Sequence, residues 1–135
     1  MALGGRGGMA TPIPEDRGLT AQETSLVAWL LEHGNPDFVD FLPDLSEARV
    51  ISRCPCGCAS VDFAIGAAVP PVGAGLHVLS DYQWQAADGS LFGVFVFERG
   101  GQQAGLEVWS IDGQIAASSL PEIDQLRPLV FAPTA

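Results

Sequence analysis

The feature that most constrains the fold is a change in the spacing of apolar residues along the chain. Within residues 21–33 they recur three and four positions apart, as Leu26, Val27 and Leu30 do, which is typical of one face of an α-helix. From residue 49 onward apolar and polar residues tend to alternate, as they do in β-strands. A chain that changes period in this way predicts an α+β domain whose helices come first.

The predicted helix over residues 21–33 has a start signal and a stop signal. Thr20 and Glu23 have the spacing of a capping box, in which each side chain accepts a hydrogen bond from a backbone N–H at the helix start. Gly-Asn-Pro at residues 34–36 ends the helix. The same Asn-Pro pair is typical of a helix start, and it predicts a short second helix over residues 35–42.

The later part of the chain predicts β-strands separated by turns. Asp-Gly and Gly-Gly pairs punctuate this region, and the connections after residue 75 are short, so neighbouring strands should pair in sequence order. We therefore expect an α+β fold with one or two N-terminal helices packed on a four- to five-stranded antiparallel meander sheet. The strand segments are residues 50–53, 61–65, 76–85, 91–99 and 105–111.

Two regions are expected along the chain. Residues 1–18 contain five glycines, two prolines and no aromatic residue, which predicts a flexible N-terminal segment. Residues 19–135 are expected to form a single α+β domain. The sequence shows neither the pattern of a secretory signal nor an apolar run long enough to span a bilayer, so we expect a cytoplasmic protein that does not bind membranes.

The charge of the chain restricts the kinds of partner that it is expected to bind. Sixteen acidic residues face six arginines and no lysine, and the formal net charge is -10. Such a surface repels nucleic acid and anionic lipid over about 8 to 10 Å and attracts cationic proteins over the same range. A basic protein partner is the functional interpretation, and solubility alone is the alternative. The sequence does not indicate whether the protein is a monomer or a dimer.

Two groups of residues are candidates for contact with such a partner. The first is the densest acidic run, which is otherwise an ordinary solvated helix face. The second surrounds a predicted Asp-Gly hairpin, where aromatic rings and carboxylates together suit the recognition of arginine or lysine, unless the rings pack in the core. The first group is Asp37, Asp40, Asp44 and Glu47, and the second is Asp81, Tyr82, Trp84 and Asp88.

The Cys-Pro-Cys-Gly-Cys segment suggests a second chemistry. A turn would bring Cys54, Cys56 and Cys58 together, and such a group could bind zinc with His33 or His77 as a fourth ligand. The chain has no second pair of ligands of the kind that structural zinc sites use. We therefore expect no cofactor, and we interpret the segment as a tight connection with reduced cysteines, keeping metal binding as an alternative.

Catalytic motifs are not found in the sequence. It contains no G-x-S-x-G, no phosphate-binding loop and no H-E-x-x-H. Glu98 and Glu107 could form a carboxylate pair across the sheet, but solvent-facing strand residues are the simpler interpretation. We therefore expect a protein that is not an enzyme, with a small enzyme using Glu107 or Cys58 as the third alternative.

Two segments carry a resemblance to known proteins. Residues 49–63 contain the cysteine segment followed by Ser60, Val61 and Asp62, and residues 106–113 read Leu-Glu-Val-Trp-Ser-Ile-Asp-Gly. In both, the chain resembles a group of small bacterial proteins of uncharacterised function that share a C-x-C-G-C-x-S/T-V-D knuckle and an L-E-V-aromatic-S-x-D-G strand. The resemblance implies a common fold and no activity.

The size, the acidity and the lack of catalytic motifs also resemble, as a class, immunity proteins that neutralise toxins delivered by neighbouring bacteria. The sequence therefore predicts an acidic, non-enzymatic binding protein. The expected function is that of an immunity protein against a basic toxin, for example a nuclease from a contact-dependent growth inhibition system. Because its surface is acidic, such a protein can occlude the cationic surface with which a nuclease binds nucleic acid.

Overall fold

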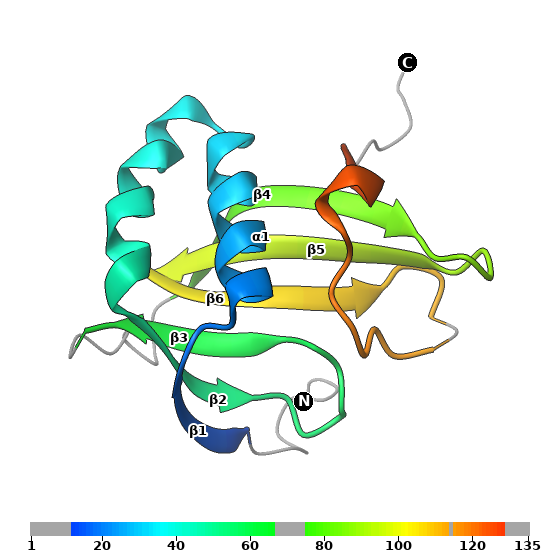
Figure 1. The fold of residues 1–135 in the computed structure, drawn as a ribbon, viewed down its shortest axis with the longest axis horizontal. Coiled ribbons are helices and arrows are strands. Elements are labelled where there is room, and N and C mark those ends of the chain that lie inside the picture. Colours follow the sequence, from blue (N-terminus) through cyan, green and yellow to red (C-terminus); the bar gives the residue numbers. More distant parts are fainter. Residues whose placement is uncertain (1–11, 67–74, 114, 129–135) are drawn as a thin grey trace.

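The computed structural model describes residues 12–66, 75–113 and 115–128, which form an α+β fold with helices packed on a seven-stranded sheet. We call the sheet face that carries α1 the near face, and the opposite one the far face (Figure 1). Among the described residues, no helix is long and apolar enough to cross a membrane. The elements are β1 (Ile13–Gly18), α1 (Ala21–Glu32), η2 (Pro36–Glu47), β2 (Ala48–Arg53), β3 (Val61–Ile65), β4 (Leu76–Gln85), β5 (Leu91–Arg99), β6 (Gln102–Ser110), η3 (Ile123–Gln125) and β7 (Arg127–Pro128).

The strand order corrects the prediction of a four- to five-stranded meander. All neighbours in the order β1-β2-β3-β6-β5-β4-β7 pair antiparallel, so two runs of sequential strands are joined where β3 pairs with β6. We call this junction the seam, and it consists of the pairs Val61 with Leu106 and Asp62 with Gly105. Strands β3 and β4, although consecutive in the sequence, are therefore not neighbours, because β6 and β5 lie between them.

The prediction that residues 1–18 are flexible is wrong for Ile13–Gly18, which forms strand β1 at one edge of the sheet. Its residues pair with β2 from Ile13 opposite Arg53 to Gly18 opposite Arg49. The strand is polar and its side chains alternate between half-buried and exposed, so no apolar period marks it in the sequence. Residues 1–11 lie outside the described part of the chain.

The predicted start of the first helix is confirmed. The backbone N–H of Glu23 donates to Thr20 Oγ1 over 3.0 Å, and the backbone N–H of Thr20 donates to Glu23 Oε1 over 2.8 Å. The second helix is a 3-10 helix and is longer than predicted, since Pro43 lies within η2 and does not end it. Its N-cap is Asn35, as expected.

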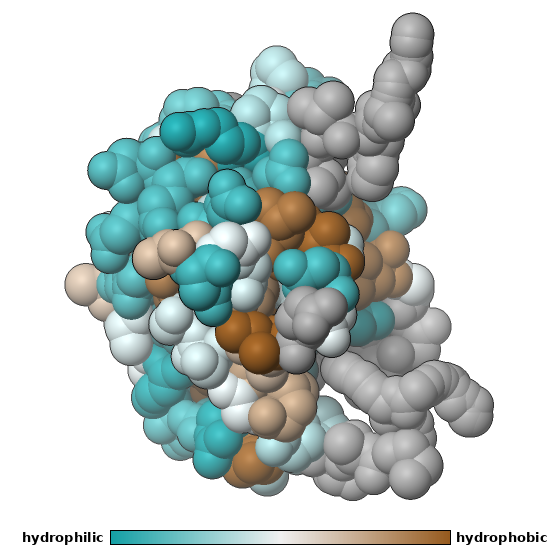
Figure 2. Space-filling model, turned by 90° about the vertical axis from the view of Figure 1, so that its right-hand side faces the viewer, coloured by the Kyte–Doolittle hydropathy of each residue, from teal (hydrophilic) through white to brown (hydrophobic). Residues whose placement is uncertain are grey.

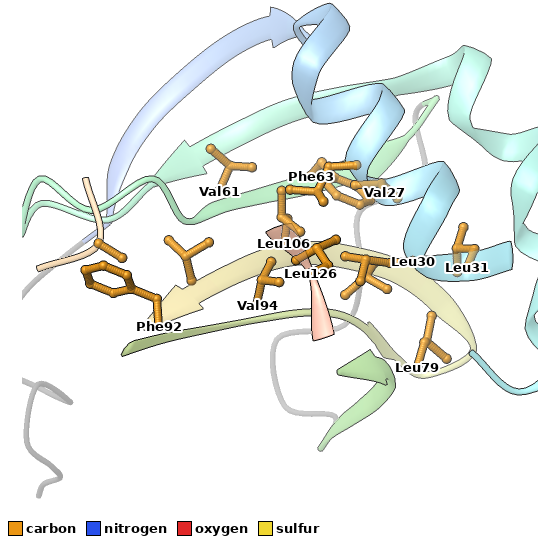
Figure 3. Packing of buried hydrophobic residues seen from close by; sticks show 14 of the residues in the cluster. Val27, Leu30, Leu31, Val61, Phe63, Leu79, Phe92, Val94, Leu106 and Leu126 are labelled. Atoms are coloured by element: carbon orange, nitrogen blue, oxygen red, sulfur yellow. The ribbon is translucent and has the colours of Figure 1, made fainter. Parts of the chain in front are cut away.

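The hydrophobic core lies between α1 and the near face of the sheet (Figure 3). The apolar face of α1 is completely buried in this core, since the side chains of its four apolar residues at helical spacing are at most 1% exposed. Phe63 of β3 is the largest side chain in this core with no exposed surface. The buried residues of this core include Leu26, Val27, Leu30 and Leu31 from α1, with Val50, Val61, Phe63, Leu79, Trp84, Phe92, Val94, Val96, Leu106 and Val108 from the sheet.

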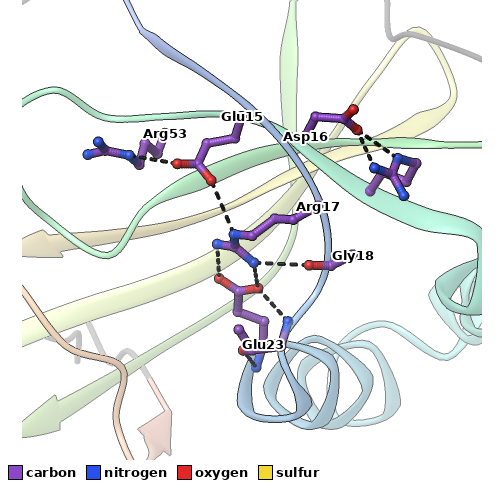
Figure 4. A network of polar contacts seen from close by, with 8 residues as sticks. Glu15, Asp16, Arg17, Gly18, Glu23 and Arg53 are labelled. Atoms are coloured by element: carbon purple, nitrogen blue, oxygen red, sulfur yellow. Dashed lines mark hydrogen bonds and ion pairs between the residues drawn. The ribbon is translucent and has the colours of Figure 1, made fainter.

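A network of ion pairs connects β1 with the start of α1 (Figure 4). The Arg17 guanidinium forms two bonds to the Glu23 carboxylate, at 2.9 and 3.0 Å, and a third to Glu15 at 3.3 Å. Arg53 of β2 donates to the other oxygen of Glu15 over 2.9 Å. Burial of Glu23 raises its pKa, but the bonds from Arg17 and Thr20 outweigh this effect and leave that pKa below its usual value.

Replacing Arg17 by methionine is expected to destabilise the fold by about 2 kcal/mol at pH 7, because Glu23 is left buried without its cation. This expected loss of stability is smaller than the loss for a fully buried ion pair, because Arg17 is half-exposed. Since the pKa of Glu23 is lowered in the folded state, the stabilisation is present above the ordinary pKa of about 4.5 and lost as the pH falls. Urea unfolding of the unaltered protein and the Arg17→Met variant at pH 7 and pH 3 measures the difference in their stability. An equal difference at both pH values would contradict a stabilising ion pair between Arg17 and Glu23.

Candidate functional site

Aromatic residues line the far face of the sheet. In the pairing of β5 with β6, Gly93 lies opposite Trp109, Phe95 opposite Glu107 and Phe97 opposite Gly105. Val94 and Val96, which alternate with these residues on β5, belong to the core on the near face. The far face therefore carries rings from two neighbouring strands, and no helix of the described residues covers them.

Two glycines allow these rings to lie against the sheet. A Cβ atom at Gly93 would be 2.4 Å from Nε1 of Trp109, and one at Gly105 would be 2.5 Å from Cζ of Phe97. Both distances are far below van der Waals contact, so each ring occupies the space that a side chain would need. Trp109 is nevertheless 37% exposed, which makes it the most accessible ring on this face.

Carboxylates border the aromatic residues. Asp81 of β4 lies opposite Phe95, and Asp62 of β3 lies opposite Gly105. One oxygen of Asp81, Oδ1, is buried and has no hydrogen-bond partner among the described residues. Burial raises the pKa of Asp81 above its usual value. A cation that approached this face would give the Asp81 carboxylate the partner that the fold does not provide.

A pocket of about 460 Å³ adjoins the aromatic residues. Phe97, Glu107 and Trp109 line it, as do the three cysteines of the loop between β2 and β3. Arg53 and Arg99 also lie in its lining, so it contains both cationic and anionic side chains. The far face thus joins an apolar surface to a group of thiols.

The loop between β2 and β3 gathers its three cysteines, which is the arrangement that the metal-binding alternative requires. The Sγ atoms of Cys54, Cys56 and Cys58 all lie within 4.8 Å of one another. The chain reverses at Gly57, whose φ of 90° is a conformation that favours glycine. Burial, together with the neighbouring thiols of Cys56 and Cys58, raises the pKa of the Cys54 thiol to about 12.

The metal ligands proposed beyond the cysteines are not brought to them. Among the described residues, no histidine or carboxylate joins the thiol group. His33 lies at the end of α1, where its ring stacks on Trp29, and His77 lies 3.6 Å from Glu98 on β5. Glu98 itself is paired with Gln103, so it does not form a cross-strand pair with Glu107.

The predicted acidic run lies on η2. Asp37, Asp40 and Glu47 are exposed there, and the side chain of Asp44 lies outside the described part. Residues 18–48, which include both α1 and η2, contain six acidic residues and no lysine or arginine. Figure 2, which shows the molecule from the right-hand side of Figure 1, has mostly hydrophilic residues on its left and hydrophobic residues towards its centre.

The hairpin residues do not form one surface with η2, or with one another. Along β4, Asp81 faces the far side, whereas Tyr82 and Trp84 face the near side, because neighbouring strand residues alternate. Trp84 is 6% exposed and packs on Phe92, so of its two interpretations, partner contact and core packing, the structure supports core packing. The Tyr82 hydroxyl donates to the backbone oxygen of His33 over 2.9 Å.

Asp88 is exposed at the tip of the β4–β5 hairpin. Its carboxylate accepts a hydrogen bond of 2.9 Å from the backbone N–H of Ser90, which lowers the pKa of Asp88. This contact gives Asp88 a role in the turn itself. The hairpin group is therefore divided between a far-face carboxylate, two near-face aromatic residues and a turn residue.

Sequence reasoning missed the rings of the far face. Phe95 and Phe97 lie two residues apart in β5, and Trp109 lies in β6, so the period-two spacing was visible. The signal that would have identified them is the combination of these aromatic residues with glycines at positions 93 and 105, which marks close approach of rings to a strand.

Comparison with known proteins gave no match to any family model and no significant similarity to a curated protein or to a solved structure.

Proposed function

We propose that the protein is a non-enzymatic binding protein that captures a basic protein partner in the cytoplasm, as an immunity protein captures a toxin. The single observation that carries this proposal is the charge of the layer formed by α1 and η2. Its six acidic residues are not balanced by any lysine or arginine in residues 18–48. Of these acids, only Glu23 has an ion pair among the side chains that the structure describes.

The positions of the arginines support the same proposal. Arg17, Arg49 and Arg53 lie on β1 and β2, and all three pair with acidic residues, namely Glu15, Asp16 and Glu23. The positive charge near the helical layer is therefore already neutralised. Glu32, Asp37, Asp40 and Glu47 are exposed and remain available to an incoming cation.

A uniformly acidic layer suits a partner that itself binds a polyanion. A nuclease presents arginines and lysines to the phosphate backbone, and these side chains bind carboxylates equally well. Long-range attraction then speeds the encounter, while shorter contacts hold the complex. The same arrangement would neutralise a basic toxin by covering the surface with which it binds its substrate.

The proposal is tested with the protein encoded by the adjacent gene, produced as its C-terminal domain. We expect association of the two proteins to slow at least about tenfold between 50 and 500 mM salt, because screening shortens the range of attraction. The double substitution Asp37→Lys with Asp40→Lys should lower the association rate constant about tenfold and change the dissociation rate constant less than about threefold. Stopped-flow or surface plasmon resonance measures both rate constants.

A matched control changes the same charge elsewhere. Glu122→Lys with Asp124→Lys reverses two exposed acids around η3, outside α1 and η2, and should leave the association rate within about a factor of three. Circular dichroism establishes that both variants are folded. Association that does not depend on salt, or equal effects of the two double variants, would contradict a role for the layer of α1 and η2.

A further inference from the structure

We propose that Cys54, Cys56 and Cys58 form a three-thiolate binding site for a thiophilic d¹⁰ cation, Zn²⁺ or Cu⁺. This inference is independent of the acidic layer, which lies on other elements. The observation that carries it is that three sulfur atoms from five consecutive residues all lie within 4.8 Å of one another. They are also the only cysteines in the chain.

The spacing of the sulfur atoms is close to what a bound ion requires. With a metal–sulfur distance of about 2.3 Å, tetrahedral geometry places two sulfur ligands about 3.8 Å apart. The thiols therefore need to approach one another by roughly 1 Å at most. Cys56 is exposed and lies at the turn, so rotation of side chains can supply this movement without a change in β2 or β3.

Two backbone N–H groups of the loop already donate to sulfur, which offsets part of the cost of placing negative charge there. The N–H of Cys56 donates to Sγ of Cys54, and the N–H of Cys58 donates to Sγ of Cys56, both over 3.4 Å. Hydrogen bonds to ligand atoms of this kind orient the ligands and stabilise their charged form. Arg53 and Arg99 line the same pocket together with Asp62 and Glu107, so the lining adds no net charge beside the thiols.

The ligand set indicates which kind of metal site this is. Structural zinc sites are closed by four protein ligands, whereas sites with three protein ligands keep a position for water or another molecule. Among the described residues no histidine or carboxylate completes the group, and the pocket of about 460 Å³ lies beside it. Zn²⁺ would thus keep an accessible fourth position, while Cu⁺ is satisfied by three thiolates. We therefore assign an exchangeable site to this loop.

The experiment uses the full chain, fully reduced and freed of metal. It is titrated with Zn²⁺ alone and, anaerobically, with Cu⁺ alone, each against a chromophoric chelator, and native mass spectrometry counts the bound ions. One equivalent of either cation, bound with a Kd below about 1 μM, is the expected result. Less than about half an equivalent of both would overturn the proposal.

Variants locate the site. Cys54→Ser with Cys56→Ser and Cys58→Ser should weaken binding at least 100-fold, whereas His33→Ala with His77→Ala should leave the Kd within about threefold, because neither histidine joins the group. Retention of binding by the triple serine variant would overturn the assignment.

A measurement on the unaltered protein keeps the test independent of how the variants fold. One equivalent of the bound cation should slow alkylation of all three cysteines at least tenfold, since the thiolate is both the nucleophile and the ligand. Mass spectrometry of the alkylated peptide follows each cysteine. Unchanged alkylation in the presence of bound metal would place the ion elsewhere and refute the proposal.

Discussion

Replacing Phe63 by alanine is expected to lower the free energy of unfolding by about 3 to 5 kcal/mol, the largest effect of any single substitution considered. Phe63 has no exposed surface and belongs to the same buried cluster as Val27 of α1 (Figure 3). The truncated side chain leaves a cavity that the surrounding strand and helix cannot fill. Because domains of this kind are stable by only about 5 to 15 kcal/mol, the loss is a large part of the total.

Urea unfolding measures this loss as a lower midpoint with an unchanged slope. The matched control is Phe95→Ala, which removes the same side chain from the far face, where Phe95 is only half-buried. Its cost should be no more than about 1 kcal/mol, since less apolar surface returns to water. Equal losses for the two variants would contradict the placement of the core on the near face.

The second large effect is expected at the seam, where Gly105→Ala should cost about 2 to 3 kcal/mol. A Cβ atom at this position would lie 2.5 Å from the Phe97 ring and 2.8 Å from the backbone oxygen of Val61. The ring can rotate away, but the backbone oxygen belongs to the facing strand and cannot move alone. The substitution therefore pushes β3 from β6 at one of only two residue pairs that join them.

Two further variants separate the contributions at Gly105. Gly18→Ala, where nothing lies within 4 Å of the added atom, should change stability by less than about 1 kcal/mol. In a Phe97→Ala background, Gly105→Ala should still cost at least about 1 kcal/mol, because the clash with Val61 remains. If removal of the Phe97 ring abolished the whole cost, the backbone contact would not be the cause.

The elements that sequence predicted well are those specified by local contacts. The start of α1 depends on Thr20 and Glu23, three residues apart, and its buried face on apolar residues one turn apart. The grouping of the three thiols likewise depends on a turn within five residues. In each case the interacting residues are close in sequence, so the pattern contains the information needed.

The elements that sequence predicted badly depend on distant partners. Strand β1 is held by pairing with β2 and by the bonds of Arg17 to Glu23, and neither produces an apolar period. The strand order depends on the seam between β3 and β6, whose residues are more than forty positions apart. Pairing over such a distance is not encoded in any window of sequence.

The sequence pattern also fails to predict which face of the sheet each side chain of β4 lies on. An irregularity between Val78 and Ser80 shifts the register with β5, so a strict alternation counted from the start of the strand assigns later residues to the wrong side. Trp84 therefore lies in the core, whereas Trp109, on a strand two positions away, lies on the far face. The sequence shows that these strands carry aromatic residues. Only the strand register determines which of those residues lie on a face that a partner can contact.

The seam also has a consequence for how the chain folds. Strands β4, β5 and β6 pair through short turns, whereas Val61 and Leu106 must meet across a long intervening segment. Closing a loop of that length costs more chain entropy than forming a hairpin, and this cost precedes any gain from contact. The β4–β5–β6 hairpins should therefore form early, and the meeting of β3 with β6 should set the rate at which the native state appears.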